Sequence, residues 1–183
     1  MMKTKSKTSL LALSITCIAL SLTGCGRSDS EVATASAALA PSSHILLSEA
    51  PTPAIPVGQA RKEALPGQEV TVIGQVGGVR DPIAENYASF VMADEAIYFC
   101  DEMEDEGCTT PWDACCEDPE KLAANRASVV FLDDQGQPLS LNLKEVANLS
   151  GLNLVTIKGV VAPESTSENM IIHASGLYNV SME

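Results

Sequence analysis

Basic residues are scarce in this chain. Its 183 residues include 24 Asp and Glu but 11 Lys and Arg. Nucleic-acid binding depends mainly on Lys and Arg that neutralise phosphates, so this balance argues against a nucleic-acid partner. Aromatic residues are also few, 4% of the chain, with Trp112 as the single tryptophan. A positive groove lined with stacking aromatic side chains is therefore not expected.

Recognisable catalytic and nucleotide-binding motifs are absent as well. Neither G-x-G-x-x-G nor a P-loop occurs, and Gly77-Gly78 ends an expected strand without opening a helix. Of the two histidines, His44 lies in a Pro-rich stretch and His173 on an expected strand, where a half-buried or rim position is expected. No Ser or Cys has a recognisable His partner. We therefore predict no enzyme activity, no cofactor and no metal site.

Long apolar runs are limited to one, Leu10 to Leu22. No later stretch approaches the ~20 residues that a membrane-spanning helix needs. The run follows a basic start at Lys3, Lys5 and Lys7 and is followed by Gly24-Cys25. Leu22-Thr23-Gly24-Cys25 in this setting resembles the lipobox of bacterial lipoproteins. The resemblance implies that residues 1–24 are a signal peptide and that Cys25 carries a lipid. The alternative is an ordinary secretory signal that is cut nearby.

The same resemblance implies a location. Gly26 stands where many lipoproteins retained in the inner membrane have Asp, which favours the outer membrane, facing the periplasm or the outside. Cleavage before Cys25 leaves eight basic and 24 acidic residues, a formal charge of −16. Such a surface suits cations, basic proteins or plain solubility. We expect an envelope protein or another envelope component as the partner, the lipid as the membrane attachment, and no nucleic acid.

A flexible tether is predicted for residues 25–56. This stretch is rich in Ser, Ala, Thr and Pro and has too few bulky apolar residues to order itself. Its one apolar triplet, Ile45-Leu46-Leu47, is interpreted as a loose contact. Residues 57–183 remain as a single domain with a core of its own.

Short periodic segments fill this domain. Val57 to Leu65 has helical spacing and is ended by Pro66-Gly67, and Asn142 to Gly151 carries an N-cap, a capping-box Glu145 and a C-cap glycine. Strand patterns cover 70–76, 88–92, 128–132, 154–161 and 170–180, with Gly74 as a point where the first strand bends.

Three strands, a helix and two strands follow one another in this reading. It is the element order of the OB-fold, a small five-stranded barrel. We therefore predict an all-β, OB-like barrel with one or two short helices; an unrelated β-sandwich is the alternative.

An acidic insert, residues 95–126, separates the second and third predicted strands. It holds Cys100, Cys108, Cys115 and Cys116, and from Asp94 to Glu120 the chain has 11 acidic residues and no Lys, Arg or His. The pattern Cys, seven residues, Cys, Thr-Pro-Trp-Asp, a further residue and Cys-Cys is similar to that of uncharacterised exported lipoproteins of planctomycete-type bacteria. The resemblance implies an OB-like core and no particular activity. This sequence departs from the pattern at Ala114, where an aromatic residue is expected.

Disulfide bonds are predicted for these four cysteines. An even number of cysteines in an oxidising compartment favours disulfides. Adjacent cysteines rarely bridge each other, so Cys115 and Cys116 should each pair with one of Cys100 and Cys108. Both resulting connectivities stay open. A zinc or iron–sulfur site and a redox-active pair are the alternatives, although the spacing lacks the C-x₂₋₄-C of zinc sites and the Cys-x-x-Cys of redox pairs.

The remaining site candidates lie in and beside the insert. Asp101, Glu102, Glu104, Asp105 and Glu106 offer calcium ligands but lack the EF-hand spacing, which favours a solvated acidic face. Trp112 is expected to pack over the disulfides and a barrel face, with ligand stacking as the alternative. Because OB-folds bind ligands across strands two and three, we predict candidate binding residues on that face. They are Phe90, Met92, Val129 and Phe131, together with Trp112.

Overall fold

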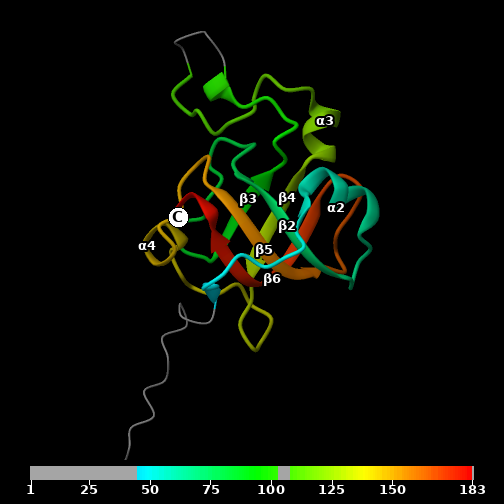
Figure 1. Cartoon of the computed structure of the whole chain (residues 1–183), viewed down its shortest axis with the longest axis vertical. Helices are drawn as coiled ribbons and strands as arrows, with labels where there is room; N and C mark the ends of the chain where they lie inside the picture. The colour runs from blue at the N-terminus through cyan, green and yellow to red at the C-terminus, as the bar shows by residue number, and fades with distance from the viewer. Residues whose placement is uncertain (1–44, 103–107, 183) are drawn as a thin grey trace, which may run out of the picture. The chain divides into compact units, whose positions relative to one another are not determined.

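Five strands of the described chain follow the order that the sequence predicts (Figure 1). The computed structural model describes residues 45–102 and 108–182. Each predicted strand and the first predicted helix are confirmed to within two residues. The five predicted strands are β2 (Glu69–Val76), β3 (Ser89–Ala93), β4 (Arg126–Phe131), β5 (Leu154–Val161) and β6 (Met170–Asn179), and a sixth, short strand precedes them, β1 (Ile55–Pro56). The helices are α2 (Val57–Glu63), α3 (Pro119–Ala124) and α4 (Leu143–Val146), with 3₁₀ turns η1 (Cys100–Glu102) and η2 (Val180–Met182).

The sheet closes on itself. Its strand order is β1-β2-β3-β4-β6-β5, and β2 also pairs with β5, so β2 to β6 form a closed five-stranded barrel. The β4–β6 pair is parallel, and the other four pairs of the barrel are antiparallel. This is an OB-like barrel, as predicted, and the β-sandwich alternative is wrong because two separate sheets would leave β2 unpaired with β5.

The bend in β2 is set by Gly74. Residues up to Gln75 pair with β5, whereas Gln75 and Val76 pair with β3. A Cβ at Gly74 would lie 2.6 Å from the carbonyl oxygen of Ala93 and 2.8 Å from a methyl group of Val57. A side chain would therefore block the approach of β3 and α2 at the bend.

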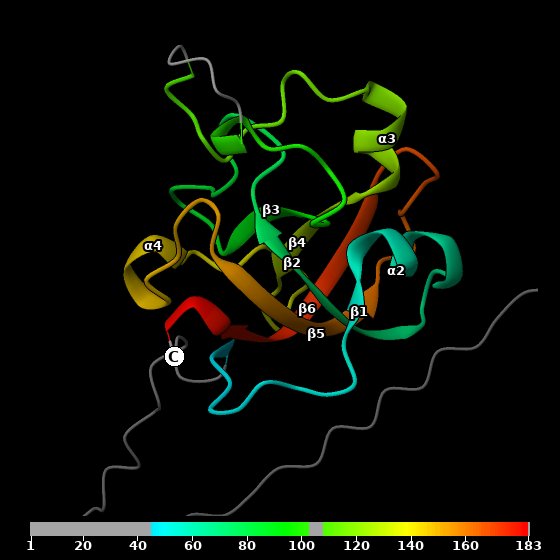
Figure 2. The same ribbon diagram turned by 45° about the horizontal axis from the view of Figure 1, so that its top comes forward.

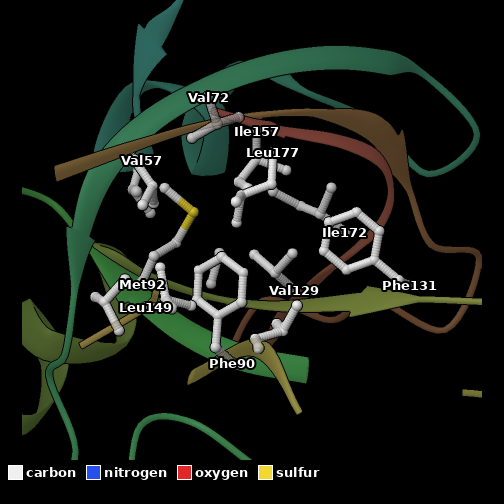
Figure 3. Close-up of a cluster of buried hydrophobic side chains, with 14 of the residues drawn as sticks. Val57, Val72, Phe90, Met92, Val129, Phe131, Leu149, Ile157, Ile172 and Leu177 are labelled. Atoms are coloured by element: carbon white, nitrogen blue, oxygen red, sulfur yellow. The ribbon is translucent and has the colours of Figure 1, made fainter. Parts of the chain in front are cut away.

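Alternate residues of the strands fill the barrel (Figure 3). Because successive side chains of a strand point to opposite faces, one set from each strand is enclosed when the sheet closes. The largest fully buried side chains of this interior include Phe90, Phe131, Met92, Leu143, Ile157, Ile172, Leu177, Val57 and Val72.

The predicted boundary between tether and domain, at residue 56, lies too late in the sequence. Ile45 is 5% exposed and belongs to the core, and the backbone N–H of Leu47 donates to Leu177 O at 2.8 Å. Ile55 and Pro56 form β1, which pairs with β2. The domain therefore includes residues 45–56, because these apolar side chains gain burial at a sheet edge where prolines are tolerated. Residues 25–44 of the predicted tether lie outside the described residues.

Asn142 caps α4 as predicted. Its side-chain oxygen accepts a hydrogen bond from Lys144 N at 3.0 Å, and its amide donates to Glu145 Oε1 at 3.1 Å. The predicted end of the helix is wrong, since α4 ends at Val146 and Asn148 has a φ of 47°. Asn tolerates this left-handed conformation, so it reverses the chain before Gly151 is reached.

The insert between β3 and β4 has its own small core. Ala93, Ile97, Phe99 and Ala114 form this second buried cluster. Figures 1 and 2 show the insert, including α3, at one end of the barrel strands. No helix in the described part of the chain is long and apolar enough to cross a membrane.

Candidate ligand-binding site

A cleft of about 510 Å³ lies where three separate segments meet. This volume is typical of small-ligand pockets, which span roughly 300–1,000 Å³. The three segments are the β2–β3 loop, the insert, and α4 together with the residues that follow it. The lining residues are 80–85, Trp112, Lys144 and 149–151.

Trp112 is held in this cleft by contacts with the β2–β3 loop and with the segment that follows α4. Its indole Nε1 donates a hydrogen bond to Arg80 O at 2.8 Å, and its carbonyl oxygen accepts one from Gly78 N at 2.8 Å. Its ring lies directly against Gly151, where a Cβ would come within 2.5 Å of the ring carbon Cδ2. The tryptophan is thus fixed by its own backbone, its N–H group and one ring face.

Two glycines make the approach of the insert possible. A Cβ at Gly77 would lie 2.5 Å from Trp112 O and 2.9 Å from the ring of Phe99. Gly77 and Gly78 directly follow β2 and belong to no nucleotide-binding motif. In the structure they leave room for the insert to contact the barrel.

The segment that carries Trp112 is paired with the other arm of the insert. Cys100 N donates to Asp113 O at 2.8 Å, and Asp101 N donates to Pro111 O at 3.0 Å. The Sγ atoms of Cys100 and Cys115 lie 3.6 Å apart, and those of Cys115 and Cys116 lie 3.9 Å apart. None of the four cysteines of the insert forms a disulfide bond in the structure.

The four thiols differ in their surroundings. Burial raises the pKa of the Cys100 thiol to about 12. The backbone and then the hydroxyl of Thr110 lower the pKa of the exposed Cys108 thiol. The neighbouring Cys115 thiol raises the pKa of Cys116. Cys108 is therefore the accessible thiol on which ionisation is favoured, and Cys100 is the protected one.

Charged side chains of both signs surround the cleft. Arg80 and Lys144 are cations, Asp81 and Glu85 are anions, and all four are exposed. Among the described residues, ion pairs join Lys121 to Glu117 and His173 to Glu164. Within this part of the chain the four charges of the cleft are thus outside any ion pair.

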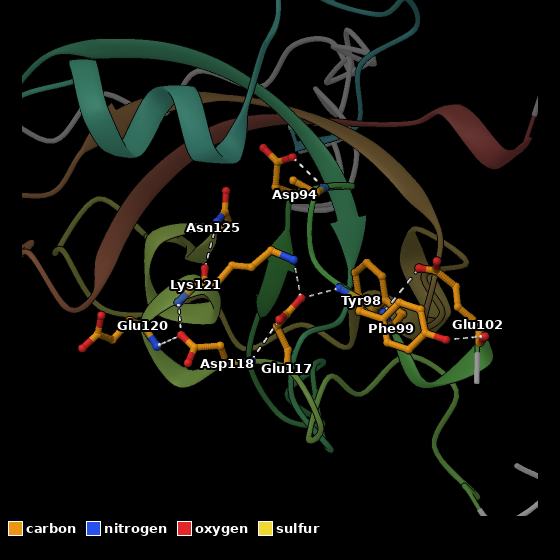
Figure 4. Close-up of polar contacts among 10 residues, drawn as sticks. Asp94, Tyr98, Phe99, Glu102, Glu117, Asp118, Glu120, Lys121 and Asn125 are labelled. Atoms are coloured by element: carbon orange, nitrogen blue, oxygen red, sulfur yellow. Dashed lines mark hydrogen bonds and ion pairs between the residues drawn. The ribbon is translucent and has the colours of Figure 1, made fainter. Parts of the chain in front are cut away.

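Other acidic residues, in the insert and directly before it, have structural partners (Figure 4). Asp94 accepts hydrogen bonds from Gly58 N at 2.7 Å and from Ala96 N at 2.9 Å, which ties the insert to the first turn of α2. The Lys121 ammonium, followed by the backbone N–H groups of Tyr98 and Asp118, lowers the pKa of Glu117 to about 2. Glu117 therefore stays ionised through most of the acidic range.

Helix α3 was missed at the sequence level although its signal is present. Asp118 accepts hydrogen bonds from Glu120 N and Lys121 N, both at 3.0 Å, and Pro119 occupies the first helical position. An N-cap Asp followed by Pro is a standard helix start. Its six residues are too few to show a helical period.

The predicted binding face on β3 and β4 is wrong for four of its residues. Phe90, Met92, Val129 and Phe131 are each at most 2% exposed, and Figure 3 shows them in the barrel interior. The sequence shows that side chains alternate along each strand, but it does not show which set is enclosed. Closure of the barrel encloses the aromatic set and leaves small and β-branched residues outside. The outward residues are Ser89, Val91, Ser128 and Val130.

Trp112 is the one predicted ligand-binding residue that lies in the cleft. The other lining residues were not identified from the sequence. The one available signal was the charged and polar segment from Arg80 to Asn86 between two strands, because conspicuous loops carry binding residues more often than strands do.

The remaining candidates have simple positions. His173 is half-buried on β6, and its Nε2 lies 3.0 Å from Glu164 Oε1. Asp101 and Glu102 are exposed. Among the described residues no three His, Cys, Asp or Glu side chains are arranged to hold a metal ion. Cys25, His44, Glu104, Asp105 and Glu106 lie outside the described residues.

No family model and no curated protein matches this chain. Solved structures similar to it include an OBody bound to hen egg-white lysozyme, at 19% identity and a TM-score of 0.33, covering 66% of this chain and 89% of that one. Another is a small single-stranded DNA-binding protein from Streptomyces coelicolor, at 14% identity and a TM-score of 0.32, covering 65% of this chain and 98% of that one. The fold assignment given above rests on strand order and register.

Proposed function

We propose that this protein is a lipid-anchored binding module of the cell envelope, without catalytic activity, and that the cleft around Trp112 is its ligand site. The observation that supports this most is the fixation of the only tryptophan at the meeting point of three segments. A rigid aromatic wall reduces the entropy lost on binding.

The anchor is the lipid on Cys25, in the outer membrane. The basic start, the apolar run and Leu22-Thr23-Gly24-Cys25 support this. Residues 25–44 are then long enough to hold the barrel away from the membrane as a tether.

Replacement of the lipidated residue tests the anchor. We expect Cys25→Ser to move the protein from the detergent phase to the aqueous phase and to abolish fatty-acid labelling, because the acyl chains supply the membrane affinity. Phase partition with detergent measures the first effect and metabolic labelling the second. Cys17→Ser is the matched control, since Cys17 lies within the predicted signal peptide. Unchanged partition of Cys25→Ser contradicts the lipoprotein assignment.

Cysteines 100, 108, 115 and 116 are proposed to form two disulfides. The 3.6 Å separation of the Cys100 and Cys115 Sγ atoms supports Cys100–Cys115 with Cys108–Cys116 over the crossed connectivity. The second candidate function is a metal-handling or redox protein that would use the same four cysteines.

Capture of partners from intact envelope tests the binding function. We expect the full chain to retain an envelope component, and Trp112→Ala to lose it while the barrel stays folded, because the substitution removes one wall of the cleft. Tyr98→Ala is the control, since Tyr98 is an exposed aromatic residue of the same insert that does not line the cleft. The readout is mass spectrometry of the retained material, with circular dichroism to check folding.

Single-stranded oligonucleotides form the second arm of this experiment. A formal charge of −16 after cleavage opposes phosphate binding, so we expect no measurable affinity for DNA or RNA at physiological salt. Salt-sensitive micromolar binding of an oligonucleotide contradicts the proposal. Equal capture by the parent and by Trp112→Ala would remove the cleft from the function.

A further inference from the structure

We infer that the Trp112 cleft binds a neutral, hydroxyl-rich saccharide of the cell envelope. The inference rests on the proposed function and specifies its ligand class. It depends on three properties of the cleft: the balance of its charges, its apolar floor, and the fixed orientation of its aromatic wall.

The charges of the cleft favour a neutral ligand. Arg80 and Lys144 face the same space as Asp81 and Glu85, and within residues 45–102 and 108–182 none of the four takes part in an ion pair. A strongly anionic ligand would meet two carboxylates, and a strongly cationic one would meet two cations. A ligand without net charge avoids both repulsions.

The polar groups of the cleft also match hydroxyl groups in kind. Guanidinium and ammonium groups donate hydrogen bonds only, whereas ionised carboxylates accept them only. A hydroxyl group does both. Several hydroxyls on one sugar ring can therefore accept hydrogen bonds from Arg80 and Lys144 and donate hydrogen bonds to Asp81 and Glu85. Hydrogen bonds with charged partners are the stronger ones, so a polyhydroxylated ligand gains from all four residues.

The apolar surface of the cleft suits the faces of sugar rings, which carry C–H groups. Pro82, Ile83 and Leu149 are buried and line the cleft together with Trp112. An indole ring is a large, flat apolar surface with an electron-rich face. The ring cannot turn away, because its N–H group is bonded to Arg80 O and one face rests on Gly151. A cleft of about 510 Å³ has room for a short oligosaccharide.

The single tryptophan makes this inference directly measurable. Trp112 is the only tryptophan of the chain, so intrinsic tryptophan fluorescence reports on the cleft alone. The probes are a tetramer of N-acetylglucosamine, neutral oligomers of glucose, mannose and galactose, an acidic oligomer of galacturonic acid, and a tetrapeptide of neutral side chains. The full chain is used in a detergent without sugar groups.

We expect a saturable change in fluorescence with at least one neutral oligosaccharide. Its dissociation constant should be the same at low and at high salt, because no net charge is exchanged. Calorimetry should show that Trp112→Phe weakens binding several-fold and Trp112→Ala by about tenfold or more, equivalent to at least 1.4 kcal/mol. Asp81→Asn and Lys144→Gln should each weaken it several-fold, whereas Lys158→Gln on β5 and Glu120→Gln on α3 should not.

The remaining outcomes overturn the inference in distinguishable ways. Salt-sensitive binding of the acidic oligomer alone, or binding of the tetrapeptide alone, would replace the ligand class. No response to any saccharide, with Trp112-dependent capture of an envelope component, would remove the saccharide and keep the binding module. No response together with no capture would remove both.

Discussion

Reduction of the folded domain is expected to lower its free energy of unfolding by about 2–5 kcal/mol, the usual cost of losing disulfides in small secreted domains. The unfolded chain gains freedom when the cross-links open. For the proposed disulfide between Cys100 and Cys115, 15 positions apart, loop-closure entropy corresponds to about 3 kcal/mol. Urea unfolding with and without reductant, followed by circular dichroism, measures the difference.

Most of the stability lost on reduction should come from the pair Cys100 and Cys115. Cys100→Ala with Cys115→Ala should lose more stability than Cys108→Ala with Cys116→Ala, because the first pair carries the buried Cys100 and spans the longer loop. Peptide mapping of the exported protein should recover Cys100 linked to Cys115 and no free thiol. Four alkylatable thiols with stoichiometric zinc or iron would instead support the metal-handling function. Four alkylatable thiols without metal would contradict both.

A methyl group at Gly151 is expected to displace the Trp112 ring. The added Cβ would lie 2.5 to 2.6 Å from three ring atoms, and Trp112 cannot simply withdraw because its backbone is bonded to Gly78. We expect Gly151→Ala to destabilise the fold by about 1–3 kcal/mol, the typical range for overpacking. The tryptophan emission should shift to longer wavelength as the ring becomes more exposed, and captured ligand should be lost.

Gly136→Ala supplies the matched control. Gly136 has a φ of 75° in a turn and nothing within 4 Å of the added methyl group. Its substitution therefore costs stability through backbone strain, without touching Trp112. We expect the control to lower the unfolding midpoint and to leave the emission maximum unchanged. If Gly151→Ala leaves both the emission and the midpoint unchanged, the ring contact with Gly151 does not position Trp112.

Sequence patterns predict the strands of the barrel and the start of α4 well, because these features depend on residues that are close together in the sequence. Val70, Val72 and Val76 alternate with Thr71, Ile73 and Gln75, a period of two that identifies β2. Asn142 accepts a hydrogen bond from the backbone N–H of Lys144 and donates one to the Glu145 carboxylate, all within one helical turn, so the start of α4 is predictable from local sequence. Its end is not, because Asn148 took the left-handed position before Gly151.

Such patterns do not predict that a residue is buried by residues far away in the sequence. Ile45 and Ile55 stand among prolines and small polar residues, which together indicate a tether. Their apolar side chains are nevertheless buried or half-buried, since the barrel offers them β2 and the end of β6. The composition of a segment indicates whether the segment can fold alone. It does not indicate how much apolar surface the segment buries by packing against the barrel.

Sequence patterns are sufficient to predict the order of the strands, the capped start of α4 and Trp112 as a residue of interest, and the acidic composition is the basis for expecting no nucleic-acid partner. Tertiary structure alone decided that Phe90 and Phe131 lie inside the barrel and that the cleft forms around Trp112. Closure of a sheet determines which of two alternating faces is enclosed. The contacts of Trp112 with Gly78, Arg80 and Gly151 join segments more than 30 residues apart, and no local period records such a distance.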